Sequence, residues 1–240
     1  MKTEKNYLFA DVPVTIAAQY PFLIHMCQGY ETETPGIRIE VTPEEIEREH
    51  TDSGTEFSKG YLESLAVYRK ICEEMISHDT FLFHGSAVEV DGQAYIFTAP
   101  SGTGKSTHVR LWKERFGERA VVINDDKPLL QVREDAVYVC GTPWSGKDAL
   151  NTNRKAPIGG ICLLERGTTN RVEPISPADG YPALYRQTYR PEDRVKLIKT
   201  LGLLGQVVKR IPLYRMQCDI SQDAVTAAWE AMSGGNKVDE

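Results

Sequence analysis

The sequence lacks any cysteine arrangement typical of a metal site or a disulfide framework. Its five cysteines are widely separated, and no two of them have the C-x-x-C spacing of zinc ligands and redox pairs. At 240 residues, the chain is long enough to bury a substantial core without covalent cross-links. We therefore expect reduced thiols that take no part in the chemistry.

Long apolar runs and an excess of positive charge are also absent. No segment approaches the length needed to cross a bilayer, and residues 1–16 lack the apolar stretch and cleavage site of a signal peptide. The formal net charge of −6 disfavours a broad nucleic-acid surface. These absences predict a cytoplasmic protein with neither a nucleic-acid nor a membrane partner.

Residues 1–80 predict an N-terminal β-rich subdomain that also contains a helix. Short apolar segments alternate with turn formers, which indicates a small antiparallel layer made by NYLFADVPVTI, QYPFLIHM and GIRIEV. Thr42 to Glu45 have the pattern of a capping box at the start of a short helix. Apolar residues then recur at three- and four-residue steps from Lys59 to His78, the period of an amphipathic helix.

Residues 81–175 predict a β-rich core built around one glycine-rich loop. The alternating segments FHGSAVEV and QAYIFTA are joined by Asp91-Gly92, a strong hairpin signal. A helix over 106–116 follows the loop, and strands are expected at AVVIN, LLQV, AVYVC, IGGICLLE and RVEPI.

Residues 176–240 predict a helical part packed on that core, which would make the whole chain one compact domain. Helices are expected over 177–187 and 191–209 and near 222–232, with a strand at LYRMQCDI.

The glycine-rich loop is the strongest functional signal. Residues 99–106, APSGTGKS, match the Walker A pattern except that Ala99 stands where glycine is usual. In such a loop the backbone N–H groups curl around phosphate oxygens, and the following helix adds the positive end of its dipole. We predict that Lys105 reaches the β- and γ-phosphates and that Ser106 is a Mg²⁺ ligand. The nucleotide contacts expected from the loop are those of Ser101, Gly102, Thr103, Gly104, Lys105, Ser106 and Thr107.

A pair of carboxylates is placed to complete this site. Asp125 and Asp126 end a predicted strand about twenty residues after the loop, which leaves room for one helix and a strand that returns beside the first. Mg²⁺ prefers oxygen ligands. Neighbouring side chains on a strand point to opposite faces, so both carboxylates reach the site only if the chain turns, as Lys127-Pro128 predicts. The alternative is a solvated acidic turn.

An unusual loop follows, with the sequence CGTPWSGKDALNTNRKAPIGG over residues 140–160. Its cations could contact the transferred phosphate, and Trp144 could pack on a base or substrate. Lys147 and Arg154 are the preferred phosphate contacts. The alternative is an ordinary surface connection whose cations are solvated.

The order of these motifs resembles that of the HPr kinase/phosphorylase and ATP-dependent PEP carboxykinase group, most nearly its smaller HPr-kinase-like members. The resemblance covers roughly residues 80–165 and is carried by His84-Gly85, the glycine-rich loop and the double Asp. It implies a PEP carboxykinase-like α/β fold, a mixed β-sheet curled toward a barrel with helices packed on one side. It also implies that His84 lies beside the phosphate site, that one carboxylate of the pair acts near the metal and that the other is the base. We assign Asp125 to the metal and Asp126 to the base, and the reverse assignment stays open.

Together, the motifs predict a Mg-ATP-dependent kinase that transfers the γ-phosphoryl group to a hydroxyl of a protein or peptide serine or of a small metabolite. Its cofactors are ATP and Mg²⁺, and a homo-oligomer remains open. Two alternatives also remain: a small-metabolite kinase on the ordinary parallel-sheet P-loop fold, and a non-catalytic nucleotide-binding accessory module. The hairpin before the loop disfavours the first, and the intact Lys105, Ser106, Asp125 and Asp126 disfavour the second.

Overall fold

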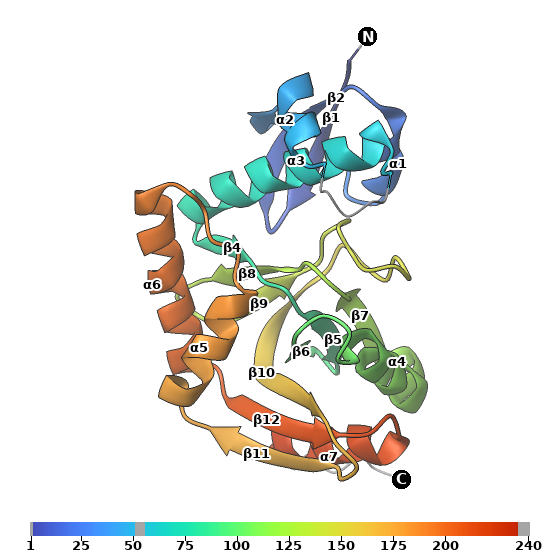
Figure 1. Ribbon diagram of the computed structural model, residues 1–240, viewed down its shortest axis with the longest axis vertical. Coiled ribbons are helices and arrows are strands. Elements are labelled where there is room, and N and C mark those ends of the chain that lie inside the picture. Colours follow the sequence, from blue (N-terminus) through green and yellow to red (C-terminus); the bar gives the residue numbers. More distant parts are fainter. Residues whose placement is uncertain (1, 51–55, 235–240) are drawn as a thin grey trace. The chain divides into compact units, whose positions relative to one another are not determined.

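The computed structural model describes residues 2–50 and 56–234, which fall into two compact units divided between His78 and Asp79 (Figure 1). None of the helices in this described part has the length and apolarity that a bilayer crossing requires. The two units are described in turn.

The N-terminal unit is a three-stranded sheet with helices. Its strands β1 (Thr3–Phe9), β2 (Val12–Ala18) and β3 (Ile37–Ile39) lie in that order, and its helices are α1 (Pro21–Met26), α2 (Pro43–Arg48) and α3 (Lys59–Met75). The capping box at the start of α2 is confirmed, because the Thr42 and Glu45 side chains each bond the other's backbone N–H.

Two expectations for this unit are wrong. QYPFLIHM is not a strand: it forms α1, with Pro21 in the first turn and Leu23 buried. The layer is not purely antiparallel either, because β3 pairs with β2 in the parallel sense. A short apolar run is ambiguous between strand and helix by periodicity alone, and here a proline that fits the first helical turn decides it.

The C-terminal unit is built on a mixed sheet that has nine strands in the described residues. The main path runs β4-β8-β9-β10-β6-β5-β7, and β12 joins it by pairing with both β10 and β11. The strands are β4 (Thr80–Leu82), β5 (Ser86–Val90), β6 (Gln93–Thr98), β7 (Ala120–Asn124), β8 (Leu129–Val132), β9 (Val137–Cys140), β10 (Lys155–Arg166), β11 (Arg171–Ile175) and β12 (Leu213–Cys218).

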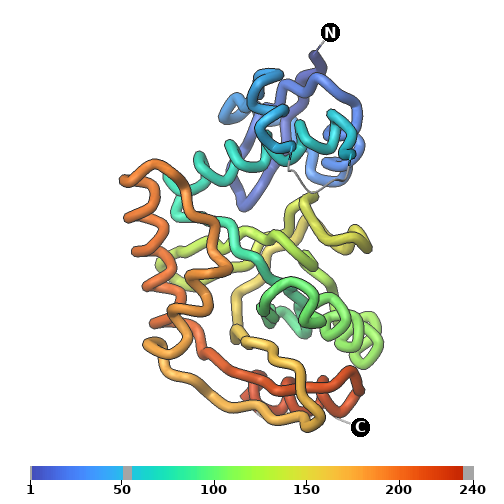
Figure 2. Tube along the Cα trace, in the orientation of Figure 1, coloured from blue at the N-terminus to red at the C-terminus, as the bar shows by residue number. Residues whose placement is uncertain are grey.

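Strand β10 makes this sheet curl. Its first residues, Lys155–Pro157, pair antiparallel with β9, and its second half, Ile161–Arg166, pairs parallel with β12. The register against β6 shifts between Ile158 and Gly160. Strand β10 is curved along its length (Figures 1 and 2). The mixed, curled α/β sheet that the sequence predicted is therefore confirmed.

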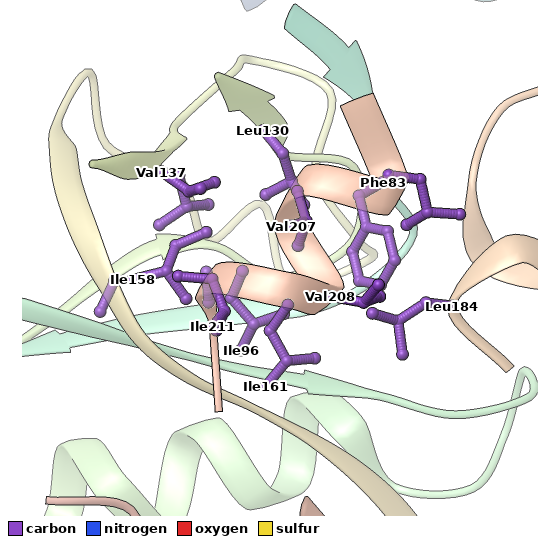
Figure 3. Close-up of a cluster of buried hydrophobic side chains, with 14 of the residues drawn as sticks. Phe83, Ile96, Leu130, Val137, Ile158, Ile161, Leu184, Val207, Val208 and Ile211 are labelled. Atoms are coloured by element: carbon purple, nitrogen blue, oxygen red, sulfur yellow. The ribbon is translucent and has the colours of Figure 1, made fainter. Parts of the chain in front are cut away.

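Helices cover both faces of the sheet rather than one. Ile96 of β6 belongs to a core that also contains Leu130 of β8 and Val207 of α6 (Arg194–Arg210), and α5 (Pro177–Gln187) joins it through Leu184 (Figure 3). Phe97, the next residue on β6, packs on the opposite face against α4 (Lys105–Phe116) and α7 (Gln222–Met232). Because successive side chains of β6 point to opposite faces of the sheet, they pack into two separate cores.

The strand that follows α4 does not return beside β6, as a simple βαβ unit would require. The predicted hairpin forms, with positive φ angles of 53° at Asp91 and 83° at Gly92, and places β5 against one edge of β6. Strand β7 therefore pairs with β5 instead, and β10 lies parallel on the other edge of β6. With an antiparallel neighbour beside its loop-bearing strand, this sheet differs from that of the ordinary parallel P-loop fold.

Candidate functional site

The glycine-rich loop, the double Asp and His84 lie at one end of the strands of the C-terminal sheet. Strands β6, β10 and β12 run parallel, and β7 runs in the same direction because both β6 and β7 are antiparallel to β5. The carboxyl ends of these four strands therefore lie at the end of the sheet where β5 begins. The glycine-rich loop leaves β6 there, Asp125 and Asp126 leave β7, and His84 precedes β5.

The glycine-rich loop folds as a tight turn into α4. Gly102 and Gly104 have φ angles of 79° and 121°, values that a residue with a Cβ rarely adopts. The backbone N–H and the hydroxyl of Thr103 both donate to the Pro100 carbonyl, at 3.3 and 2.9 Å. Within residues 2–50 and 56–234, no side chain accepts a hydrogen bond from the N–H groups at the start of α4.

Lys105 lies against this loop. Its side chain is buried, and Nζ donates to the Ala99 carbonyl at 3.0 Å. Burial lowers the pKa of this ammonium, and the negative charge of Asp126 acts in the opposite direction. The structure thus brings the loop lysine within electrostatic reach of one of the two carboxylates.

Asn124 holds the acidic turn, a role that the sequence analysis missed. Its Oδ1 accepts the backbone N–H groups of Asp126 and Lys127 at 2.8 and 2.7 Å, while Nδ2 donates to the carbonyls of Thr142 and Trp144 at 2.9 and 3.2 Å. This bonding bends the chain directly after β7. An Asn just before Asp-Asp-Lys-Pro was the available local signal for such a turn.

Asp126 faces a histidine and a lysine. Its Oδ1 lies 3.1 Å from His84 Nε2, and its Oδ2 lies 3.1 Å from Lys127 Nζ. Partial burial by itself would raise the pKa of this carboxyl, but His84 and Lys127 together outweigh burial and lower it to about 2. Asp126 is therefore an anion at neutral pH.

His84 is fixed by the end of α5. Its backbone N–H donates to the Gln187 carbonyl at 2.7 Å, and its Nδ1 lies 2.8 Å from Gln187 Oε1. The two ring nitrogens thus lie beside side-chain oxygens of two different segments, Asp126 and Gln187. Gln187 is 103 residues away along the chain, so no local pattern could have identified it.

Asp125 is held differently from its neighbour. Its side chain is 2% exposed, and Oδ1 accepts the Gly146 N–H at 2.5 Å. Its Oδ2 is buried and has no hydrogen-bond partner within residues 2–50 and 56–234. Burial raises the pKa of this carboxyl, the Gly146 N–H lowers it, and Asp126 raises it further.

Two residues of the loop after Cys140 do not fit their predicted roles. The Arg154 guanidinium forms an ion pair with Glu89 of β5 at 3.0 Å. In this structure its partner is therefore that carboxylate and not the glycine-rich loop. Trp144 is buried, and its ring is not available to pack on a base, contrary to the prediction. Lys147 is exposed and directly follows Gly146, the residue that contacts Asp125.

Comparisons with known proteins give matches among solved structures and not among family models or curated sequences. No protein-family model matches the chain, and no curated protein matches its sequence. Solved structures do match, among them the HPr(Ser) kinase/phosphatase from Coxiella burnetii. That protein is 11% identical over 64% of this chain and 93% of its own, with a TM-score of 0.35.

Proposed function

We propose that this chain is a Mg-ATP-dependent kinase that transfers the γ-phosphoryl group to a hydroxyl of a protein or peptide serine or of a small metabolite. The observation that carries the proposal is that the glycine-rich loop and the two carboxylates lie at the same end of the sheet. The effect of the Asp126 charge on the pKa of Lys105 links the two halves of the site.

In this proposal the glycine-rich loop binds the phosphates of the donor, and the acidic turn accepts the proton of the acceptor hydroxyl. Backbone N–H groups between Ser101 and Thr107 surround the phosphate chain, and the Lys105 ammonium leaves the Ala99 carbonyl to contact the β- and γ-phosphates. Lys147 is proposed as a further phosphate contact. For Arg154 that role requires its guanidinium to leave Glu89.

Asp126 is proposed to accept the proton of the attacking hydroxyl, with His84 orienting its carboxylate. A pKa of about 2 makes Asp126 a weak base. A weak base suffices here because phosphoryl transfer passes through a loose transition state, in which positioning and charge stabilisation contribute most of the catalysis.

The residues present fit a magnesium ion. The Asp125 Oδ2 is a buried acceptor without a partner among the described residues, and Ser106 lies in the first turn of α4. The described residues contain no group of three or more His, Cys, Asp or Glu that could hold a metal. Mg²⁺ is usually held by one or two carboxylates plus phosphates and water, so the phosphates of the donor would complete a site begun by Asp125 and Ser106. When bound, Mg²⁺ would neutralise charge on the phosphates.

The position of the site within the fold favours this proposal over the two alternatives. An ordinary parallel-sheet kinase lacks an antiparallel strand beside its loop-bearing strand, and here β5 occupies that place. An accessory module has no need of a carboxylate held by both a histidine and a lysine. The cytoplasmic location and a homo-oligomeric state stay predictions.

Transfer of a labelled phosphate tests the proposal. The purified chain is incubated with γ-labelled ATP, Mg²⁺ and a cell extract that has been depleted of its own nucleotides. Label in an acid-stable, phosphatase-sensitive ester is expected with the natural chain and not with Lys105→Ala. Equal labelling by both proteins, or label that appears only as inorganic phosphate, would contradict a kinase.

A further inference from the structure

A cavity of about 520 Å³ lies beside β7, the last strand on the main path of the C-terminal sheet. We call it the β7-edge cavity. It is bounded by α4, by β7 and by residues 148–152, and its lining includes no residue of the glycine-rich loop or the double Asp. Its volume is within the range of ligand sites, roughly 300–1,000 Å³.

Two cations of α4 line this cavity. Arg110 and Lys113 are three residues apart, so they lie on the same face of the helix. The Lys113 ammonium is already held, because it donates to the carbonyls of Gly117 and Ala120 at 2.8 and 2.7 Å. The Arg110 guanidinium has neither a hydrogen-bond nor an ion-pair partner within residues 2–50 and 56–234. Its planar fork of donors is therefore free to bind a carboxylate.

The wall opposite α4 belongs to a tight loop, residues 145–151. The Ala149 N–H donates to the Gly146 carbonyl at 3.0 Å, and the Asn151 side chain donates to the Ser145 hydroxyl at 2.9 Å. Ala149 has a φ of 51°, a value that is uncommon for a residue with a Cβ. The same loop supplies the Gly146 N–H that Asp125 accepts, so one loop shapes both the cavity and the acidic site.

The remaining lining of the β7-edge cavity is one acid and several apolar side chains. Asp148 lies on the loop wall, and in the described part of the chain it has no hydrogen-bond or ion-pair partner. Its charge would direct an acidic group of a ligand toward α4. Between the charged walls lie Val121, Val122 and Leu150. The lining thus suits a ligand with one anionic group and an apolar body.

Two elements lead from the proposed transfer site to this cavity. On α4, Ser106, Arg110 and Lys113 follow one another at steps of four and three residues and so share a face. Arg110 lies roughly 6 Å along the helix axis from Ser106, the proposed Mg²⁺ ligand. On β7, Asp125 comes three residues after Val122, roughly 10 Å along an extended strand. The cavity is therefore separated from the transfer site by the length of a few residues of extended peptide.

We propose that the β7-edge cavity binds an acidic side chain of a peptide or protein acceptor, about three residues away from the serine that is phosphorylated. The inference rests on the proposed function and narrows its acceptor to a polypeptide. The carboxylate of the acceptor pairs with Arg110, and Lys113 adds a second positive charge. The transfer is unchanged: the serine oxygen bonds to the γ-phosphorus, the bond to the bridging oxygen breaks, ADP leaves and Asp126 takes the hydroxyl proton.

Phosphorylation of a peptide library tests this inference. Each synthetic peptide has one central serine, and each pool fixes one other position as Glu or, in the matched pool, as Gln. The pools are incubated with γ-labelled ATP, Mg²⁺ and the natural chain or Arg110→Gln, which removes the positive charge. The matched control is Arg115→Gln, because Arg115 is also an exposed arginine of α4 and does not line the cavity.

We expect the natural chain and Arg115→Gln to label Glu pools about tenfold more than Gln pools when the fixed position is about three residues from the serine. Arg110→Gln should lose that preference and still bind a non-hydrolysable ATP analogue as tightly as the natural chain, as titration calorimetry would report.

Three results would overturn the inference and leave the kinase proposal standing. These are equal labelling of Glu and Gln pools by the natural chain, an acid preference that survives in Arg110→Gln, and no labelled pool while the cell extract is labelled. If the natural chain labels neither the pools nor the extract, the proposed function itself fails, and the inference fails with it.

Discussion

The two flanks of strand β6 are built from different chemistry. On the flank of β5 and β7, the Asp125 and Asp126 carboxylates and the His84 ring contact polar groups, and the buried Asn124 holds the turn that carries the acids. On the flank of β10 and β12, aliphatic side chains, Arg166 and Asp219 line a cavity beside the glycine-rich loop, and the buried His108 is neutral. We call the first the acidic flank, to which the proposed function assigns phosphoryl transfer, and the second the cavity flank.

This contrast predicts two kinds of failure. Changes on the acidic flank should reduce turnover, since they alter groups whose interactions strengthen in the transition state. Changes on the cavity flank away from the glycine-rich loop should leave the chemical step intact. Changes in the glycine-rich loop, which lies between the two flanks, should reduce both nucleotide affinity and turnover.

The largest effect is expected at the loop, from Lys105→Ala. Removing the ammonium should lower kcat/KM for Mg-ATP by about four powers of ten, because both ground-state binding and transition-state stabilisation are lost. The fold should survive, as far-UV circular dichroism would report. Lys209→Ala, at an exposed position on α6, is the control and should keep full activity. Comparable activity in the two variants would show that the loop does not bind the donor.

On the acidic flank, Asp126→Asn should lower kcat about a thousandfold and change the affinity for Mg-ATP only a few-fold. The asparagine keeps the shape and loses the proton acceptor. Single-turnover transfer from labelled ATP, together with calorimetric binding, separates the two quantities. Normal turnover in Asp126→Asn would show that another group takes the hydroxyl proton.

On the cavity flank, His108 should make the chain sensitive to acid. Its folded pKa of about 4 lies below its ordinary value of 6.5, so the unfolded chain takes up the proton first. The stability it contributes is fully present above pH 6.5 and is lost as the pH falls toward 4, by about 3 kcal/mol.

Urea unfolding between pH 7 and pH 4 measures this dependence. His108→Gln has no titrating group at this position, and its stability should fall by about 3 kcal/mol less over the same range. If the two unfolding curves shift equally with pH, the ring of His108 is not kept neutral by burial.

The smallest effect is expected from Gly146→Ala, which tests how closely the acidic flank is packed. A Cβ at residue 146 would lie 2.8 Å from Asp125 Oδ2, so the carboxylate must move. We expect kcat to fall about tenfold because a displaced Asp125 no longer presents that oxygen to a cation. Gly202→Ala on α6 is the matched control, since nothing lies within 4 Å of its Cβ position. Unchanged Mg²⁺-dependent activity in Gly146→Ala would argue against the metal role of Asp125.

Local patterns in the sequence predicted much of the C-terminal unit. The predicted helices over 177–187 and near 222–232 match α5 and α7, and the Asp91-Gly92 hairpin forms. Capping residues, turn chemistry and periodicity act over a few residues, so a single sequence displays them.

The remaining features depend on contacts between distant residues. Sequence patterns could not show that Gln187 holds His84, that Arg154 pairs with Glu89, or that β5 separates β6 from β7. For the same reason the cavity beside the glycine-rich loop was not predicted: its walls come from segments of the chain around residues 102–111, 164–167 and 218–220, which meet only in the folded sheet.

A crystal structure with Mg²⁺ and a non-hydrolysable ATP analogue tests the central claim most directly. Our account predicts phosphates on the N–H groups of the loop and the γ-phosphate toward Asp126. A nucleotide bound in the reverse direction, with its base at the acidic flank, or a loop that holds no phosphate, would contradict it.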